Sequence, residues 1–189
     1  MSQTQGPQIG EVSPDGQFRW DGQDWMPLAR GYREPTPWTV PMQRAAAAYF
    51  VLATVEQLVT TALFTNTATI EHTIRASNPA MPSDQVQTAA SMGVIFAWAV
   101  VIALGAVMVF LAVASILRWL WAFWVVLVWL ALSSIGVVTS VFALLGTSAQ
   151  SQPRGSIAAG LVLAVAALTL LIWFIVAAAR YGPWAMRRP

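Results

Sequence analysis

The sequence predicts an all-α integral membrane protein: a four-transmembrane-helix bundle with a short N-terminal β-hairpin and a helical extracytoplasmic hairpin. Three observations support this prediction. Of the 189 residues, 57% are hydrophobic and only 10% are charged, whereas soluble domains carry about 25% charged residues. The apolar residues form blocks, and a bilayer-spanning helix needs about 20 such residues. The charged residues lie outside these blocks or at their ends, with one exception, Glu56.

The composition also limits the function. The chain has no cysteine and one histidine, His72, which excludes disulfides, thiol catalysis and the usual zinc spacings. Sequence motifs of hydrolases, metalloproteases and phosphate-binding loops do not occur. The basic residues do not cluster into a nucleic-acid patch. We therefore expect a protein without catalytic residues, metal ligands or cofactors, and one that binds no nucleic acid.

Residues 1–43 form the only long polar segment, in which we expect a cytoplasmic tail with a β-hairpin at 13–28. Asp-Gly pairs at 15–16 and 21–22 favour two-residue turns, because glycine accepts positive φ. An isolated hairpin is marginal in water, so we expect it to pack on the bundle, a partner or the membrane surface. The candidate docking residues surround the second turn: Phe18, Trp20, Asp21, Gly22 and Trp25.

Residues 14–25 carry the pattern PDG-x-F-R-W-D-G-x-x-W. This pattern resembles a WDGxxW element near the N-termini of uncharacterised bacterial four-helix membrane proteins. The C-terminal sequence RYGPWAMRRP, residues 180–189, is similar to the tail of such a family. The resemblance covers about a tenth of the chain and implies a bacterial plasma membrane protein without an assigned activity. The two tryptophans either hold a small hairpin together or also dock a protein partner.

The first span is expected at 45–64, after a proline-rich linker at 29–43. Apolar residues continue at helical spacing beyond the span, which predicts one helix from Met42 to about Ala76. The sequence Ser-Asn-Pro at 77–79 ends it, and Ser83 is the expected N-cap of the next helix. Residues 66–92 would then form a helical hairpin outside the bilayer.

The remaining spans are expected at 93–117, 119–146 and 157–179, followed by a basic tail at 181–189. Spans two and three form an apolar run with a single charge, Arg118, and the run is too long for one crossing. The chain must therefore turn near Arg118. The expected membrane-interface anchors are tryptophans and arginines at span ends: Trp38, Arg44, Arg118, Trp119, Trp121 and Arg180.

Charge asymmetry predicts that both termini are cytoplasmic. With four spans the termini share one side, and seven arginines flank the spans there, against two on the other side. An excess of arginine marks the cytoplasmic side. The seven are Arg30, Arg33, Arg44, Arg118, Arg180, Arg187 and Arg188, and the two are Arg75 and Arg154.

Glu56 and its neighbour Gln57 are the intramembrane polar candidates. Glu56 lies roughly 18 Å along the first span, just past the bilayer midplane. A carboxylate there must be protonated, paired or turned toward the bundle interior. It can be a structural hydrogen-bonding residue, a lipid or partner contact, or a group that handles protons or cations. Its candidate hydrogen-bond partners are nearby polar residues: Gln57, Thr60, Thr61, Ser133, Ser134 and Thr139.

The sequence thus favours a non-enzymatic accessory or scaffold protein that acts through membrane lipid or a protein partner. A protein partner would bind at the N-terminal hairpin or at the 66–92 segment. The sequence is also compatible with a homo-oligomer. The alternatives are a small transporter or channel component that uses Glu56 and, as a lesser one, a lipid-modifying enzyme.

Overall fold

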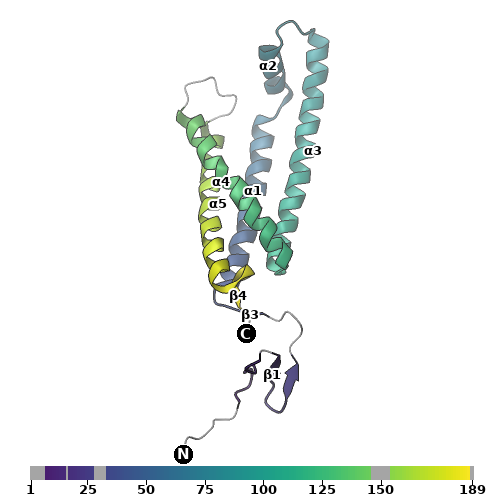
Figure 1. Cartoon of the computed structure of the whole chain (residues 1–189). Coiled ribbons are helices and arrows are strands. Elements are labelled where there is room, and N and C mark those ends of the chain that lie inside the picture. The colour runs from purple at the N-terminus through teal and green to yellow at the C-terminus, as the bar shows by residue number, and fades with distance from the viewer. Residues whose placement is uncertain (1–6, 16, 28–32, 146–153, 188–189) are drawn as a thin grey trace, which may run out of the picture.

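The computed structural model describes residues 7–15, 17–27, 33–145 and 154–187. Within these residues, four helices, α1 (Thr39–Phe64), α3 (Ser83–Ile116), α4 (Leu120–Leu145) and α5 (Arg154–Tyr181), are long and apolar enough to cross a membrane. The chain is therefore a multi-pass membrane protein with the predicted helical fold (Figure 1). The elements are β1 (Phe18–Trp20), β2 (Trp25–Pro27), β3 (Glu34–Pro35), α1 (Thr39–Phe64), α2 (Thr67–Ser77), α3 (Ser83–Ile116), α4 (Leu120–Leu145), α5 (Arg154–Tyr181), η1 (Pro183–Ala185) and β4 (Met186–Arg187).

The prediction of one helix from Met42 to about Ala76 is wrong, because the chain breaks between α1 and α2. Thr65 is extended, and the side chain of Asn66 accepts a hydrogen bond from the Thr69 backbone N–H and so caps α2. Asparagine is among the best N-cap residues, and this local signal prevails over the continuous apolar stripe. The first helix also starts earlier, at Thr39. Pro41 lies in its first turn, where a missing N–H costs little.

The helical hairpin at 66–92 is present, with α2 packed against the first turns of α3. Its expected cap is wrong: Pro82 is the N-cap, and Ser83 is already helical. From there α3 continues through the second span as one helix of 34 residues. The expected turn near Arg118 is also present, and Arg118 makes it with a φ of 61°. The predicted fourth span, 157–179, lies within α5. Gly146, the predicted end of the third span, lies outside the described residues.

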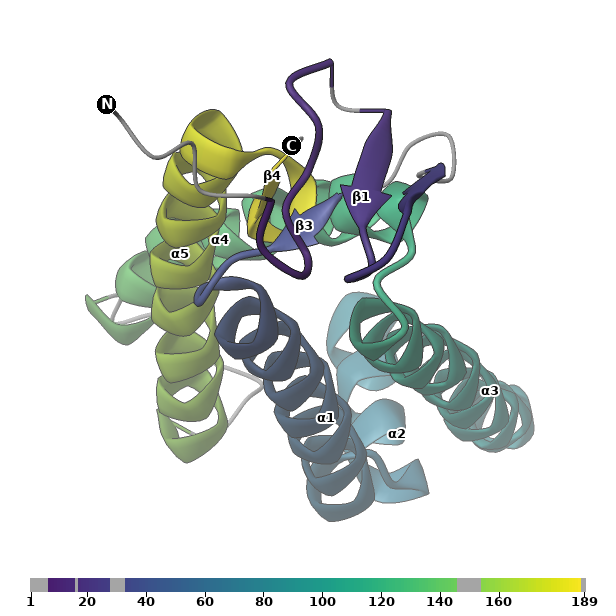
Figure 2. The same ribbon diagram turned by 90° about the horizontal axis from the view of Figure 1, so that it is seen from below.

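The transmembrane helices form two antiparallel pairs. The first pair is α1 with α3, and the second is α4 with α5. Helix α1 lies between α3 and α5, and α4 crosses it on one side (Figures 1 and 2). The two pairs meet mainly where α1 begins and α5 ends, and they diverge toward α2.

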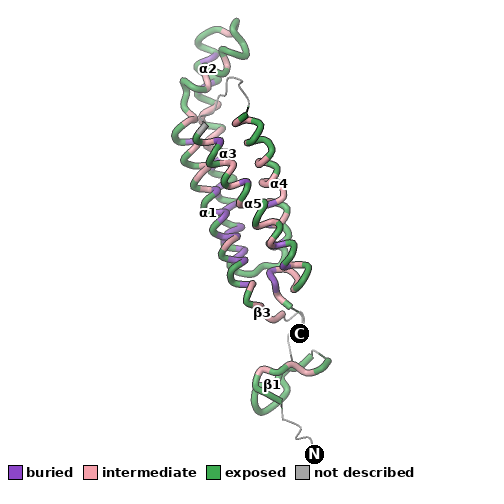
Figure 3. Tube along the Cα trace, turned by 90° about the vertical axis from the view of Figure 1, so that its left-hand side faces the viewer, coloured by how far each residue is buried: buried purple, intermediate pink, exposed green. Residues whose placement is uncertain are grey.

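Packing is therefore uneven along the bundle. Buried residues gather in the half that is nearer β3 and β4 (Figure 3). On α4, for example, all the buried positions lie between Ala122 and Leu130, and the second half of this helix exposes Phe142 and Leu145. We call the half around the start of α1 and the end of α5 the closed end, and the opposite half the open end.

The N-terminal hairpin is confirmed, with β1 and β2 antiparallel and Trp20 opposite Trp25. Its loop is longer than the predicted two-residue turn, because residues 21–24 connect the strands. Gly22 lies in this loop with a φ of 111°, a conformation that glycine adopts without strain. The other expected turn includes Gly16, which lies outside the described residues.

Candidate functional site

The sequence indicates two candidate functional parts of the described chain, the N-terminal hairpin and the polar residues of α1. A third part, the C-terminal segment, holds the helices in place. We call residues 7–15 and 17–27 the WDG module. In Figure 1 the WDG module lies beyond the closed end of the bundle, below β3 and β4.

Backbone hydrogen bonds add a third segment to the WDG module. The Gly10 N–H donates to the Trp20 carbonyl oxygen at 2.8 Å, and the Trp20 N–H donates to that of Glu11 at the same distance. In addition, the Ser13 N–H donates to the Phe18 carbonyl oxygen at 2.9 Å. Val12 forms a β-bridge with Arg19. This small sheet gives the hairpin support that two strands alone would lack.

Two aspartates fix the turns of the WDG module. A side-chain oxygen of Asp21 accepts hydrogen bonds from the backbone N–H groups of Gln23 and Asp24, both at 2.7 Å. These two donors stabilise the charged form and lower the pKa of Asp21. Asp15 accepts a hydrogen bond from the Ser13 hydroxyl, which likewise lowers its pKa. Both carboxylates are therefore ionised at neutral pH, and they make the module acidic.

The aromatic side chains form an exposed apolar face on the WDG module. The rings of Trp20 and Trp25 are in contact, with centroids 5.5 Å apart. Phe18 and Trp25 remain 37% and 38% exposed and line one shallow cavity, widely open to the surface and of about 550 Å³, together with Ser13, Pro14 and Asp15. Phe18, Trp20 and Trp25 share one face of the hairpin because alternate strand residues point to the same side. We call Phe18, Trp25 and this cavity the aromatic face.

Glu56 makes a hydrogen bond within its own helix. The Thr60 hydroxyl donates to a Glu56 side-chain oxygen at 3.0 Å, and the residue is half-buried. Of the expected partners from α4, Ser134 and Thr139 donate to carbonyl oxygens of their own helix instead. The side-chain oxygen of Gln57 is buried and has no hydrogen-bond partner in the described structure. The two polar candidates are thus adjacent, but no second ionisable group joins them among the described residues of the spans.

A comparison with protein-family models, curated proteins and solved structures gives no match for this chain. Function is therefore inferred from the residues themselves.

The C-terminal segment was expected only as a basic tail, but it closes one end of the bundle. Trp184 is fully buried, its ring lies against Phe123 of α4 and Phe174 of α5, and its indole N–H donates to the Trp119 carbonyl oxygen at 3.0 Å. We call Gly182–Ala185 the clamp.

The clamp also holds the start of α1. The hydroxyls of Thr36 and Thr39 both donate to the Ala185 carbonyl oxygen, at 2.8 and 3.0 Å. The clamp therefore joins α1, α4 and α5. Sequence reasoning missed Trp184, Thr36 and Thr39 as structural residues. The available signal was a tryptophan directly after a Gly-Pro helix break.

The expected interface anchors surround this closed end. Trp38 contacts Trp173 and Tyr181 of α5, with ring centroids 6.3 and 6.0 Å away. Trp119 and Trp121 lie together against Phe110, at the turn between α3 and α4. The other three expected anchors, Arg44, Arg118 and Arg180, are exposed.

Proposed function

We propose that this chain is a non-enzymatic accessory protein of a bacterial plasma membrane that binds a protein partner through the WDG module. The observation that carries the proposal is the aromatic face. Two large aromatic side chains stay more than a third exposed beside a cavity. Exposed aromatic residues next to a pocket are typical of the centre of a protein interface.

The charge of the WDG module indicates the chemistry of the partner. The described module carries four carboxylates, Glu11, Asp15, Asp21 and Asp24, and one arginine, Arg19. The cytoplasmic leaflet is negatively charged and attracts basic segments, so an acidic module is poorly suited to lie on it. A protein segment with an apolar side chain for the cavity and a basic residue for Asp15 fits better.

Photo-crosslinking in intact cells tests this proposal. A photoreactive residue at position 18 lies on the aromatic face, and the same residue at position 26 lies on the opposite face, where Met26 is equally apolar and 54% exposed. We expect a discrete protein adduct from position 18 and none from position 26. Phe18→Ala should also abolish co-purification of that protein, whereas Met26→Ala should retain it. Equal crosslinking from both faces, or from neither, would contradict the proposal.

The orientation belongs to the same proposal, because a cytoplasmic partner requires a cytoplasmic WDG module. The sequence places seven arginines beside span ends on the side of the termini and two on the other side, and this excess supports the orientation. A topology reporter fused after Pro189 should report a cytoplasmic location. An extracytoplasmic signal would contradict this orientation and would place the module on the extracytoplasmic side, away from a cytoplasmic partner.

One observation keeps a transport role as a second candidate: Glu56 is half-buried beside a Gln57 oxygen that has no hydrogen-bond partner in the described structure. The hydrogen bond from Thr60 supports a structural role for Glu56 more strongly. Ion or proton flux in vesicles that disappears in Glu56→Gln, with folding intact, would favour transport instead.

A further inference from the structure

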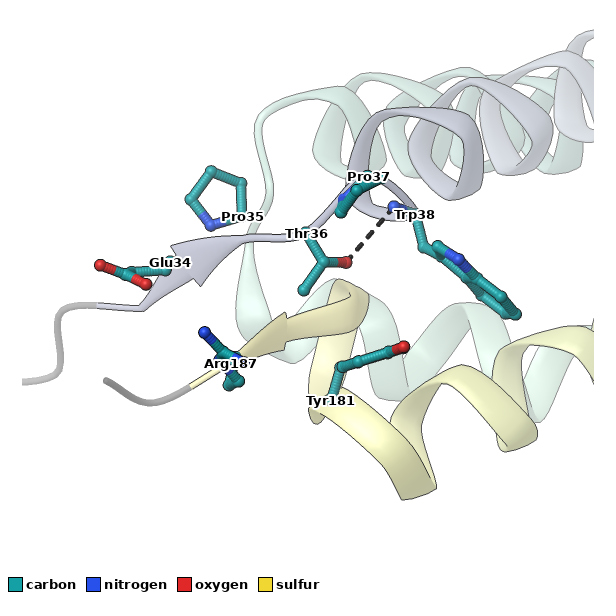
Figure 4. Close-up of a pocket in the computed structure, with 7 residues that line it drawn as sticks. All are labelled: Glu34, Pro35, Thr36, Pro37, Trp38, Tyr181 and Arg187. Atoms are coloured by element: carbon teal, nitrogen blue, oxygen red, sulfur yellow. Dashed lines mark hydrogen bonds between the residues drawn. The ribbon is translucent and has the colours of Figure 1, made fainter.

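A second cavity lies at the closed end, between the start of α1 and the end of α5. It has a volume of about 270 Å³, and Glu34, Thr36, Trp38, Tyr181 and Arg187 contribute to its lining (Figure 4). This volume lies just below the range for small-molecule sites, which begins at about 300 Å³. It suits a polar headgroup rather than a whole lipid. We call it the interfacial pocket.

Its place in the fold puts the interfacial pocket at the membrane boundary. Trp38 immediately precedes α1, and Tyr181 is the last residue of α5. Their rings are 6.0 Å apart, and tryptophan and tyrosine gather at the level of lipid headgroups. The clamp fixes both helix ends, so the pocket is a preformed feature of the closed end.

The interfacial pocket holds two opposite charges that do not pair with each other. Glu34 and Arg187 are direct partners in the β3–β4 ladder, so their side chains share a face of this two-stranded sheet. The described structure nevertheless contains no ion pair or hydrogen bond between the two side chains. Figure 4 shows both beside the pocket, on neighbouring strands. One cationic and one anionic group are therefore available to a ligand.

The Thr36 hydroxyl, another polar group of the lining, is already used. The Thr36 hydroxyl donates to the Ala185 carbonyl oxygen and accepts from the backbone N–H of Trp38. The charged groups of the lining are a guanidinium, which suits an anion, and a carboxylate, which suits a cation; the Tyr181 hydroxyl and the Trp38 indole add uncharged polar groups. A guanidinium matches phosphate oxygens, and a carboxylate accepts hydrogen bonds from a primary ammonium.

We propose that the interfacial pocket binds the phosphoethanolamine headgroup of a zwitterionic phospholipid. Arg187 contacts the phosphate, Glu34 accepts hydrogen bonds from the ammonium, and the acyl chains follow the apolar surface of the bundle. The position between two span ends favours a lipid over a soluble phosphate ester. A choline headgroup lacks N–H donors for Glu34, and a glycerol headgroup lacks the cation. This proposal is independent of the WDG module.

Lipid binding to the purified full-length chain in detergent tests the proposal. Short-chain phosphatidylethanolamine, phosphatidylcholine and phosphatidylglycerol are titrated, and their dissociation constants are compared by native mass spectrometry. We expect a preference of about tenfold for phosphatidylethanolamine, the effect of one charge-assisted hydrogen bond. Equal affinity for the three lipids, or a preference for either of the other two, would overturn the assignment.

Charge-neutral variants locate the site. Glu34→Gln should remove the preference for ethanolamine while phospholipid still binds. Arg187→Gln should raise the dissociation constants of all three lipids about tenfold. Arg180→Gln is the matched control, because Arg180 is exposed at the same helix end and does not line the pocket. If Arg187→Gln unfolds the chain, Arg187→Lys replaces it and should weaken phosphate binding less. An unchanged preference in a folded Glu34→Gln protein would overturn the proposal.

Discussion

The closed and open ends of the bundle differ in how the same four helices are held. At the closed end, the fully buried rings of Phe123 and Phe174 stack on each other, and Trp184 packs edge-on against both. At the open end, the pairs α1–α3 and α4–α5 diverge, and Glu56 bonds only within its own helix. Lipid supplies no hydrophobic force between helices. Aromatic packing and hydrogen bonds at one end therefore hold together helix pairs that diverge at the other end.

The largest expected effect comes from removing the centre of the clamp. Trp184→Ala should destabilise the bundle by about 3–5 kcal/mol, the usual cost of a large cavity at a buried aromatic site. Thermal unfolding in detergent measures the change. Trp121→Ala is the control, because Trp121 is 48% exposed. If the two variants lost similar stability, the clamp would not be the feature that holds the helices.

A smaller loss is expected from the backbone of the clamp. Gly182 has a φ of 90° and a ψ of −178°, a region that other residues enter at a cost of about 1–3 kcal/mol. A Cβ there would also approach the Met186 carbonyl oxygen to 3.2 Å. Gly182→Ala should therefore lower the unfolding temperature. Gly160→Ala should leave it unchanged or raise it slightly, since Gly160 is helical with open space around it. Equal tolerance of both changes would contradict this view of the clamp.

At the open end, Glu56→Gln should change stability by less than about 0.5 kcal/mol, because the amide oxygen can still accept the Thr60 hydrogen bond. Thr60→Val and the double variant complete a cycle that measures the pair alone. A loss of several kcal/mol for Glu56→Gln would show instead that the carboxylate interacts across helices.

The smallest effect is expected in the WDG module on acidification. The pKa of Asp21 is lowered by the N–H groups of Asp24 and Gln23. Its stabilising contribution is thus complete above the ordinary aspartate pKa of about 3.9 and is lost as the pH falls through the lowered folded-state value. Near-ultraviolet circular dichroism of the Trp20–Trp25 pair should decrease in that range. Trp20→Phe identifies this signal, and Asp21→Ala, which removes the acceptor, should show the loss already at neutral pH. A pH-independent pair signal would contradict this role of Asp21.

The sequence predicted the spans well because a helix that crosses the bilayer needs about 20 consecutive, mostly apolar residues. It also placed the turn at Arg118, where a single charge interrupts the apolar run. Helix ends were harder to predict where two local signals conflict. At Asn66, a capping side chain starts a new helix although the apolar stripe continues. The clamp and the interfacial pocket could not be predicted, since they join Thr36 and Glu34 to residues about 150 positions away. Periodicity within one segment carries no information about such contacts.

Spin-label distances test the difference between the two ends most directly, and the cysteine-free chain makes the labelling straightforward. One double-cysteine variant labels Val40 and Val176 at the closed end, and another labels Leu63 and Val162 at the open end, all four of them exposed. In lipid bilayers, the closed-end pair should give a narrow distance distribution and the open-end pair a broader one. Trp184→Ala should broaden the closed-end distribution. Distributions of equal width at both ends, unchanged by Trp184→Ala, would contradict the account.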